Sequence, residues 1–194
     1  DAARGELPPQ ISPHATSRLL PAWPEDAGDA APILVLVDEG SDNPFGEYLG
    51  EILRAEGLNA HHLGRLADLD AAPLDWYDIA ILAECRPTEA QASRLEAYVA
   101  GGGRLIAMRP DARLAHLFGV DPPAGESPDG YLQVGGGHAG GEGIAGGPLQ
   151  YHGPAGHARL AGAEAVAWLM EGPGAAAEWP AVALHQYGEG RVAL

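Results

Sequence analysis

The chain has 194 residues, with 27 acidic residues against 11 basic ones and a formal net charge of −16 at pH 7. Its length and its 46% hydrophobic content are sufficient for a folded domain with a core. Nucleic-acid binding needs a basic patch, and a membrane-spanning helix needs ~20 consecutive apolar residues. The sequence has neither feature, so we expect no nucleic-acid partner and no membrane insertion.

Residue usage excludes several kinds of chemistry. All basic residues are arginine, which excludes Schiff-base, pyridoxal and P-loop lysine mechanisms. A single cysteine, Cys85, excludes an intramolecular disulfide and a CxxC site. The adjacent His61 and His62 would point to opposite faces of a strand, and no other histidines have metal-ligand spacing. We therefore expect no cofactor and no metal. The acidity fits either the codon bias of a GC-rich genome or a halophilic surface.

Residues 1–31 are predicted to form an extended arm, because five prolines in this segment prevent a long helix or a central strand. The chain begins at Asp1 without a Met or a signal peptide and ends on an apolar strand. We therefore expect a C-terminally truncated piece of a longer, secreted, multidomain protein.

Residues 32–120 have the alternating pattern of an α/β fold. Apolar runs predict parallel strands at 33–37, 59–63, 78–83 and 104–108. Helices are predicted after Pro44, after Pro87 and over 110–118, each of them followed by a glycine. This alternation predicts a flavodoxin-like, doubly wound parallel sheet with strand order 2-1-3-4.

Two of these helices have a predicted buried face. Tyr48, Leu49, Ile52 and Leu53 recur at helical spacing in the first helix. The same spacing in the second helix selects Ala92, Leu95, Tyr98 and Val99.

The composition changes to glycine, proline and alanine after Val120. Short strands are predicted at 131–134, 149–152 and 165–169, and a hairpin pairs 181–184 with 191–194. Residues 135–147 read as a glycine-rich loop. We expect an antiparallel C-terminal extension of the sheet.

The pattern of strand, helix, Tyr-Val-x-x-Gly-Gly and strand resembles class I glutamine amidotransferase-like domains. It is similar to the trehalose-utilisation-type domains and to the middle domain of bacterial β-galactosidases. The resemblance is carried by residues 32–37, 43–46, 51–58, 77–82, 95–106 and 187–192. It implies a flavodoxin-like fold over residues 32–194 and a secreted, carbohydrate-associated parent protein.

The resemblance also implies where catalysis would occur. Catalytic members carry a nucleophilic Cys on the turn after the strand that corresponds to residues 105–108. Arg109 stands at this position, and a guanidinium has no lone pair to offer. Pro110 follows it and lacks an N–H for an oxyanion hole. No His-x-Glu pair occurs further along, so we expect no amidotransferase activity and assign no catalytic residue.

Seven residues near the carboxyl ends of the predicted strands form our candidate ligand-binding cleft: Asp38, Glu39, Ser41, Asn43, Glu84, Cys85 and Arg109. Ligands bind at this edge of doubly wound sheets. The oxygen-rich loop 38–43 suits a hard cation or a sugar, but its spacing is not that of an EF-hand. Cys85 is either a nucleophile or a buried small residue. We expect Arg109 to pair with Glu84 or Asp38 rather than to bind a ligand carboxylate.

Two functions follow from these observations. The first is a non-catalytic module that serves domain packing, assembly or ligand binding, and that contacts other domains of its parent, a second copy of the chain or carbohydrate. The alternative is a cleft hydrolase, or a binder of a small polar ligand such as a sugar, that uses Cys85 or the acidic loop.

Overall fold

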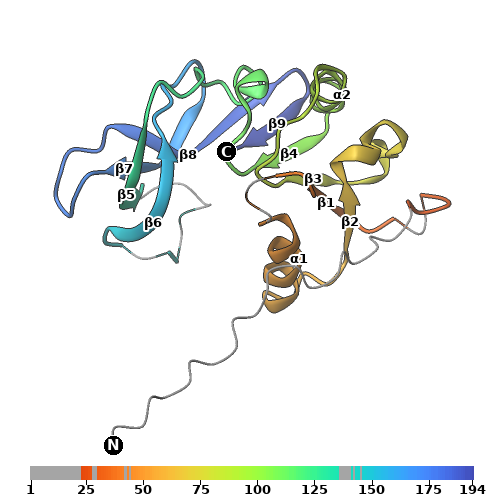
Figure 1. Cartoon of the computed structure of the whole chain (residues 1–194), viewed down its shortest axis with the longest axis horizontal. Coiled ribbons are helices and arrows are strands. Elements are labelled where there is room, and N and C mark those ends of the chain that lie inside the picture. Colours follow the sequence, from red (N-terminus) through yellow and green to blue (C-terminus); the bar gives the residue numbers. More distant parts are fainter. Residues whose placement is uncertain are drawn as a thin grey trace, which may run out of the picture.

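The computed structural model describes residues 23–27, 30–41, 43, 45–135, 141, 143–144 and 146–194 (Figure 1). Most of the expected N-terminal arm, and much of the loop over 135–147, lie outside the described residues. The helices are α1 (Gly46–Ala55) and α2 (Glu89–Ala100), with short 3-10 helices η1 (Leu66–Ala71), η2 (Leu74–Trp76) and η3 (Ala112–Leu114). The strands are β1 (Ile33–Val37), β2 (His61–Arg65), β3 (Ile79–Leu82), β4 (Arg104–Ala107), β5 (Glu126–Val134), β6 (Leu149–Gly156), β7 (Glu164–Met170), β8 (Trp179–Tyr187) and β9 (Gly190–Ala193).

The strands of the described residues form one sheet in the order β2-β1-β3-β4-β9-β8-β7-β5-β6. All neighbours from β2 to β9 are parallel, and all neighbours from β9 to β6 are antiparallel. This arrangement confirms the predicted order 2-1-3-4 and the antiparallel extension. The predicted C-terminal hairpin is β8–β9, and β9 joins the extension to the parallel half by pairing with β4.

The core lies on both faces of the parallel half. Leu34 and Leu36 of β1 belong to a large cluster with α2, and Val35 and Val37 belong to a smaller cluster with Leu49 of α1. Figure 1 shows α1 and α2 on opposite sides of these strands. Burial on both faces explains why β1 is a continuous apolar run rather than an alternating one.

Helix α2 begins and packs as its sequence predicts. The Thr88 hydroxyl accepts a hydrogen bond from the Gln91 backbone N–H at 3.3 Å, and the Gln91 side chain accepts one from the Thr88 N–H at 2.8 Å. This reciprocal capping box satisfies two N–H groups that a helix start leaves free. The four residues of the predicted face are all buried.

The predicted face of α1 is wrong in part. Leu49 is buried, but Tyr48 and Ile52 are 56% and 46% exposed. The helix approaches the sheet through glycines instead. A Cβ placed at Gly46 would lie 3.0 Å from both Ala83 Cβ and Val37 Cγ1. This close approach leaves Tyr48 and Ile52 at the surface.

The predicted helix over 110–118 is also shorter than expected. Only Ala112–Leu114 form a 3-10 helix, and turns follow up to Gly119. Asp111 accounts for the start of this element, because its carboxylate accepts a hydrogen bond from the Arg113 N–H at 2.9 Å. No helix of the described residues is long and apolar enough to cross a membrane.

Candidate functional site

The carboxyl ends of β1, β3 and β4 bring three of the predicted site residues together. Asp38 follows β1, Glu84 follows β3, and Arg109 follows β4. These strands are parallel neighbours, so their ends share one edge of the sheet. The three residues therefore lie at the same edge of the sheet, as the strand pattern predicts.

Arg109 is fixed at the centre of this edge by two acidic residues. Its Nη1 lies 3.1 Å from Glu84 Oε1, and its Nη2 lies 3.7 Å from Glu126 Oε2. Asn43 Nδ2 donates a hydrogen bond to the other Glu84 oxygen at 2.9 Å. The predicted pair with Glu84 is present in the structure. Glu126 begins β5, so Arg109 also connects the parallel half to the antiparallel half.

The backbone of Arg109 is strained. Its φ is 48°, and it is the only non-glycine residue of the described part with a positive φ. This left-handed conformation is unfavourable for a residue that carries a Cβ. A strained turn after a buried strand is the geometry that presents a nucleophile in elbow-type hydrolases. Here the turn presents a guanidinium that is engaged in ion pairs.

Two backbone N–H groups near this turn already have acceptors. The Met108 N–H donates to the Leu82 carbonyl at 2.9 Å, and the Arg113 N–H donates to Asp111. Pro110 has no N–H. An oxyanion hole needs N–H groups aimed at the reacting atom, and these three residues do not supply one.

Cys85 is a buried residue with a protonated thiol. Its side chain is 5% exposed. Burial, followed by the charges of Asp38, Asp111 and Glu84, raises the pKa of the thiol to about 12. A thiol with this pKa carries almost no thiolate at neutral pH, and the thiolate is the nucleophile. No hydrogen bond or ring contact of the described residues links a histidine to it.

Residues of the acidic loop mainly hold their own backbone or a neighbour. Asp38 accepts a hydrogen bond from the Gly40 N–H at 2.9 Å, and Ser41 Oγ accepts one from the Asn43 N–H at 3.2 Å. Glu39 turns away to Arg65 of β2, at 3.8 Å. Asp42 lies outside the described residues. Among the described residues, no group of three or more His, Cys, Asp or Glu could hold a metal ion.

A cleft of about 1060 Å³ lies beside Arg109, between β4 and the antiparallel strands. Its charged lining residues are Glu84, Arg109 and Glu126, and the rest of its lining is apolar, glycine or proline. Met108 and Val182 expose 38% and 37% of their surfaces here. An apolar cleft of this size suits a ligand or an inserted side chain from another domain.

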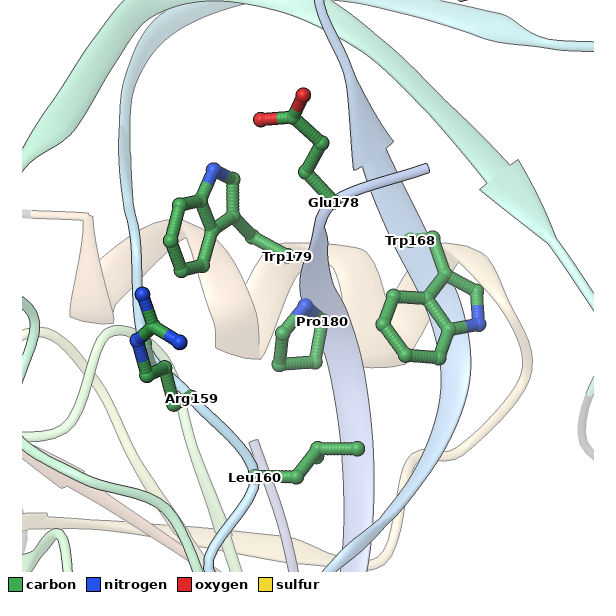
Figure 2. Close-up of a pocket in the computed structure, with 7 residues that line it drawn as sticks. Arg159, Leu160, Trp168, Glu178, Trp179 and Pro180 are labelled. Carbon is green, nitrogen blue, oxygen red and sulfur yellow. The ribbon is translucent and has the colours of Figure 1, made fainter. Parts of the chain in front are cut away.

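A second hollow, of about 510 Å³, lies on the antiparallel half and was not predicted (Figure 2). Two tryptophans flank Pro180 there, with Arg159 below Trp179 and Glu178 above it in this view. The lining residues are Ala158, Arg159, Leu160, Trp168, Glu178, Trp179 and Pro180. The sequence signal was the placement of two tryptophans in or beside predicted strands, where one face is solvent-exposed.

Comparison with known proteins identifies the fold of the chain and no sequence family. Neither a protein-family model nor a curated protein sequence matches the chain. The β-galactosidase from Rahnella sp. R3 is similar in structure with a TM-score of 0.63 and 19% identity, over 84% of this chain and 28% of the galactosidase. The exo-β-1,4-mannosidase Op5Man5 from Opitutaceae bacterium strain TAV5 has a TM-score of 0.60 and 15% identity, over 85% of this chain and 30% of the mannosidase.

A shorter protein has the same fold over most of its length. A putative ThuA-like protein from Bacteroides uniformis has a TM-score of 0.63 and 13% identity, over 89% of this chain and 84% of the other. The chain therefore spans less than a third of the two glycosidases but most of the ThuA-like protein. The chain has the α/β fold that ThuA-like proteins share with a domain of these glycosidases.

Proposed function

We propose that this chain is a non-catalytic accessory module of a larger, secreted carbohydrate-active protein, built on an amidotransferase-type scaffold. Its cleft beside Arg109 serves packing against a neighbouring domain or binding of a ligand, and not bond cleavage. The observation that carries this proposal is the state of Arg109. The residue occupies the strained position where a nucleophile would stand, and its guanidinium is engaged by Glu84 and Glu126.

The fold likeness supports the carbohydrate association. The Rahnella protein is a β-galactosidase and Op5Man5 is an exo-mannosidase, and in each the matched region is less than a third of the chain. A region of that size in an enzyme of that length is a domain among others. The resemblance in sequence to the secreted amidotransferase-like branch supports the secreted location.

The cleft itself supports docking over chemistry. Its apolar lining gives binding energy through burial, while its three charged residues are already paired with one another. A group that enters the cleft meets no unpaired carboxylate that could act as a base. Packing of an apolar side chain from a neighbouring domain satisfies this geometry without breaking the ion pairs.

The alternative of a cleft hydrolase depends on Cys85. A pKa of about 12 leaves this thiol protonated, and its neighbours Asp38, Asp111 and Glu84 all oppose ionisation. An active nucleophile needs the opposite environment, with a cation or a histidine close by. The buried thiol therefore disfavours the hydrolase.

Turnover assays test the proposal. We expect the wild-type chain and Arg109→Cys to hydrolyse L-glutamine and p-nitrophenyl acetate no faster than a buffer blank. A new thiol at position 109 would still lack a base and an oxyanion hole. We also expect iodoacetamide at pH 7.5 to modify Cys85 at least about a hundredfold more slowly in the folded chain than in urea.

The matched control is Cys85→Ser, which removes the only thiol and keeps a side chain of similar size. Turnover by the wild-type chain that disappears in Cys85→Ser would overturn the proposal and place an active site at the end of β3. Fast alkylation of Cys85 in the folded chain would also indicate a reactive thiol at the end of β3.

A further inference from the structure

We propose that the hollow formed by Trp168, Trp179, Arg159 and Glu178 is a binding site for a neutral oligosaccharide. The hollow lies on β7, β8 and the segment after β6 (Figure 2). The inference rests on the proposed function in one respect, since an accessory module of a carbohydrate-active protein needs a surface that meets the carbohydrate. The hollow shares Ala158 and Pro180 with the cleft beside Arg109, but Glu84, Arg109 and Glu126 do not line it.

The strand irregularities place the two indoles in one hollow. Trp168 of β7 lies opposite Pro180 of β8, and the register shifts between Ala167 and Trp168. A bulge of this kind redirects a side chain relative to the regular alternation of a strand. Proline, which cannot donate to the ladder, is tolerated at such an irregularity. Trp168 and Trp179 consequently lie on either side of Pro180 in Figure 2.

Trp179 is held in place by its neighbours. The His157 ring stacks on it with centroids 5.1 Å apart and an interplanar angle of 6°. Ser127 Oγ and His157 Nε2 form a hydrogen bond of 2.7 Å, which fixes the imidazole. Arg159 Cζ lies 5.4 Å from the centre of the indole. Trp179 also lines the hollow, and a ring that is already ordered loses little conformational entropy when a ligand contacts the part of it that the hollow exposes.

Residues 157–159 follow β6 and are hydrogen-bonded to the segment 121–125. The His157 N–H donates to Gly125 at 2.8 Å, and Arg159 accepts from the Asp121 N–H at 2.9 Å. His157 and Arg159 lie two residues apart, and both side chains contact the Trp179 ring. Ala158 between them is buried.

The polar groups of the hollow suit hydroxyls. Arg159 carries a fork of N–H donors, and Glu178 carries two acceptor oxygens. A pyranose presents C–H groups on its faces and hydroxyls on its rim, so it can stack on an indole while its rim reaches both residues. Their charges offset each other, and the whole chain is at −16, so a neutral sugar fits better than an acidic one.

Other ligand classes fit less well. A nucleic acid needs several cations, and Arg159 is the only one among the residues that line the hollow. A proline-rich peptide also docks against aromatic rings. The hollow offers N–H donors from Arg159 and acceptor oxygens from Glu178, a combination that favours a ligand with many hydroxyls, and we therefore commit to the oligosaccharide.

Nuclear magnetic resonance with calorimetry tests the site. The probes are cellohexaose, β-1,4-mannohexaose and β-1,4-galactotetraose, each added up to 10 mM. We expect at least one of them to shift the indole N–H resonances of Trp168 and Trp179 while those of Trp23 and Trp76 stay in place. The Kd should lie between about 10 µM and 1 mM, as is typical of a shallow site.

Variants assign the binding to the hollow. Trp168→Ala and Trp179→Ala should each weaken binding about tenfold or more, because each removes one stacking surface. Tyr48→Ala is the matched control, since Tyr48 is an exposed aromatic residue on α1. It should bind as the wild type does. Circular dichroism shows whether each variant is folded, and the wild-type resonances need no variant at all.

Three outcomes would overturn the inference. The first is that none of the three sugars shifts the two indole resonances. The second is that a synthetic proline-rich peptide shifts them while the sugars do not. The third is binding that survives both tryptophan substitutions. None of these outcomes touches the proposed lack of catalysis, which fails only if the wild-type chain shows turnover.

Discussion

The parallel half of the sheet, β2-β1-β3-β4, and the antiparallel half, β8-β7-β5-β6, bury their residues differently. In β1 every residue except Ile33 is buried, and β3 has the same pattern after Ile79. No residue of β6 is buried. The parallel half is covered by helices on both faces, as parallel sheets require, whereas an antiparallel sheet can leave one face to solvent.

Because of this difference, most of the core and the candidate binding surfaces lie in different parts of the sheet. The large apolar cluster joins β1, β3, β4 and α2, so most of the core belongs to the parallel half. Both hollows border the antiparallel half. The Arg109 ion pairs lie at the carboxyl edge of the parallel strands. Both hollows therefore involve the antiparallel extension, while the Arg109 ion pairs make the carboxyl edge of the parallel strands a contact between the two halves.

The largest expected effect is on stability, when a leucine is truncated to alanine in each half of the sheet. Leu34→Ala on β1 removes a fully buried side chain and should lower the free energy of unfolding by about 2–5 kcal/mol. Leu184→Ala on β8 changes a side chain that is 42% exposed and should cost no more than about 1 kcal/mol. Urea unfolding of both variants at one pH measures the difference. Equal losses in the free energy of unfolding would contradict the difference between the two halves, because Leu184 of β8 would then be as well packed as Leu34 of β1.

Substitutions at Arg109 test how much the contact between the two halves contributes to the free energy of unfolding. Arg109→Ala removes both ion pairs, and because these charges are partly exposed the loss should be about 1 kcal/mol or less. Arg109→Gly also removes them but relieves the strain of a φ of 48°. We expect Arg109→Gly to be more stable than Arg109→Ala by about 1 kcal/mol. The measurement is urea unfolding, and the opposite order would mean that the backbone at 109 is not left-handed in solution.

The sequence predicted the parallel half well because its signals are local. Continuous apolar runs mark strands buried on both faces, and Pro87 marks the start of α2. The strand predicted at 59–63 is instead His61–Arg65, because pairing with β1, and not its own weak apolar content, sets its register. The α1 face was predicted only in part because Gly46 and Gly50 lie against the sheet beside Leu49, while Tyr48 and Ile52 stay exposed.

The candidate sites also include one contact that the sequence could predict and others that it could not. Arg109 and Glu84 could be paired from the sequence, because parallel strand ends meet at one edge. Glu126 could not be added, since it lies in a glycine- and proline-rich region with no periodic pattern. The Trp168–Trp179 hollow depends on register shifts between β7 and β8, and a shift of one residue reverses which face a side chain takes. Such irregularities leave no trace in hydrophobic periodicity.

The smallest expected effect is a pH dependence at β2, the edge strand of the parallel half. His62 stacks against Trp23 with centroids 5.4 Å apart and lies 6.1 Å from the Tyr77 ring. Burial in this cluster lowers the pKa of His62 from its ordinary value of 6.5. The unfolded chain therefore binds this proton more readily than the folded chain does. The resulting stability is present above pH 6.5 and is lost as the pH falls through the lower, folded pKa.

Urea unfolding at pH 7.5 and 5.5 measures this effect, with His62→Phe as the control that keeps a ring against Trp23. Carboxylates titrate in both proteins, so the difference between the two pH dependences isolates His62. We expect the wild type to lose more stability than His62→Phe on acidification. A single proton limits the slope to about 1.4 kcal/mol per pH unit, and a half-buried imidazole should stay below this limit. Identical pH dependences would mean that the ring is hydrated in solution and that the edge of the parallel half is looser than its centre.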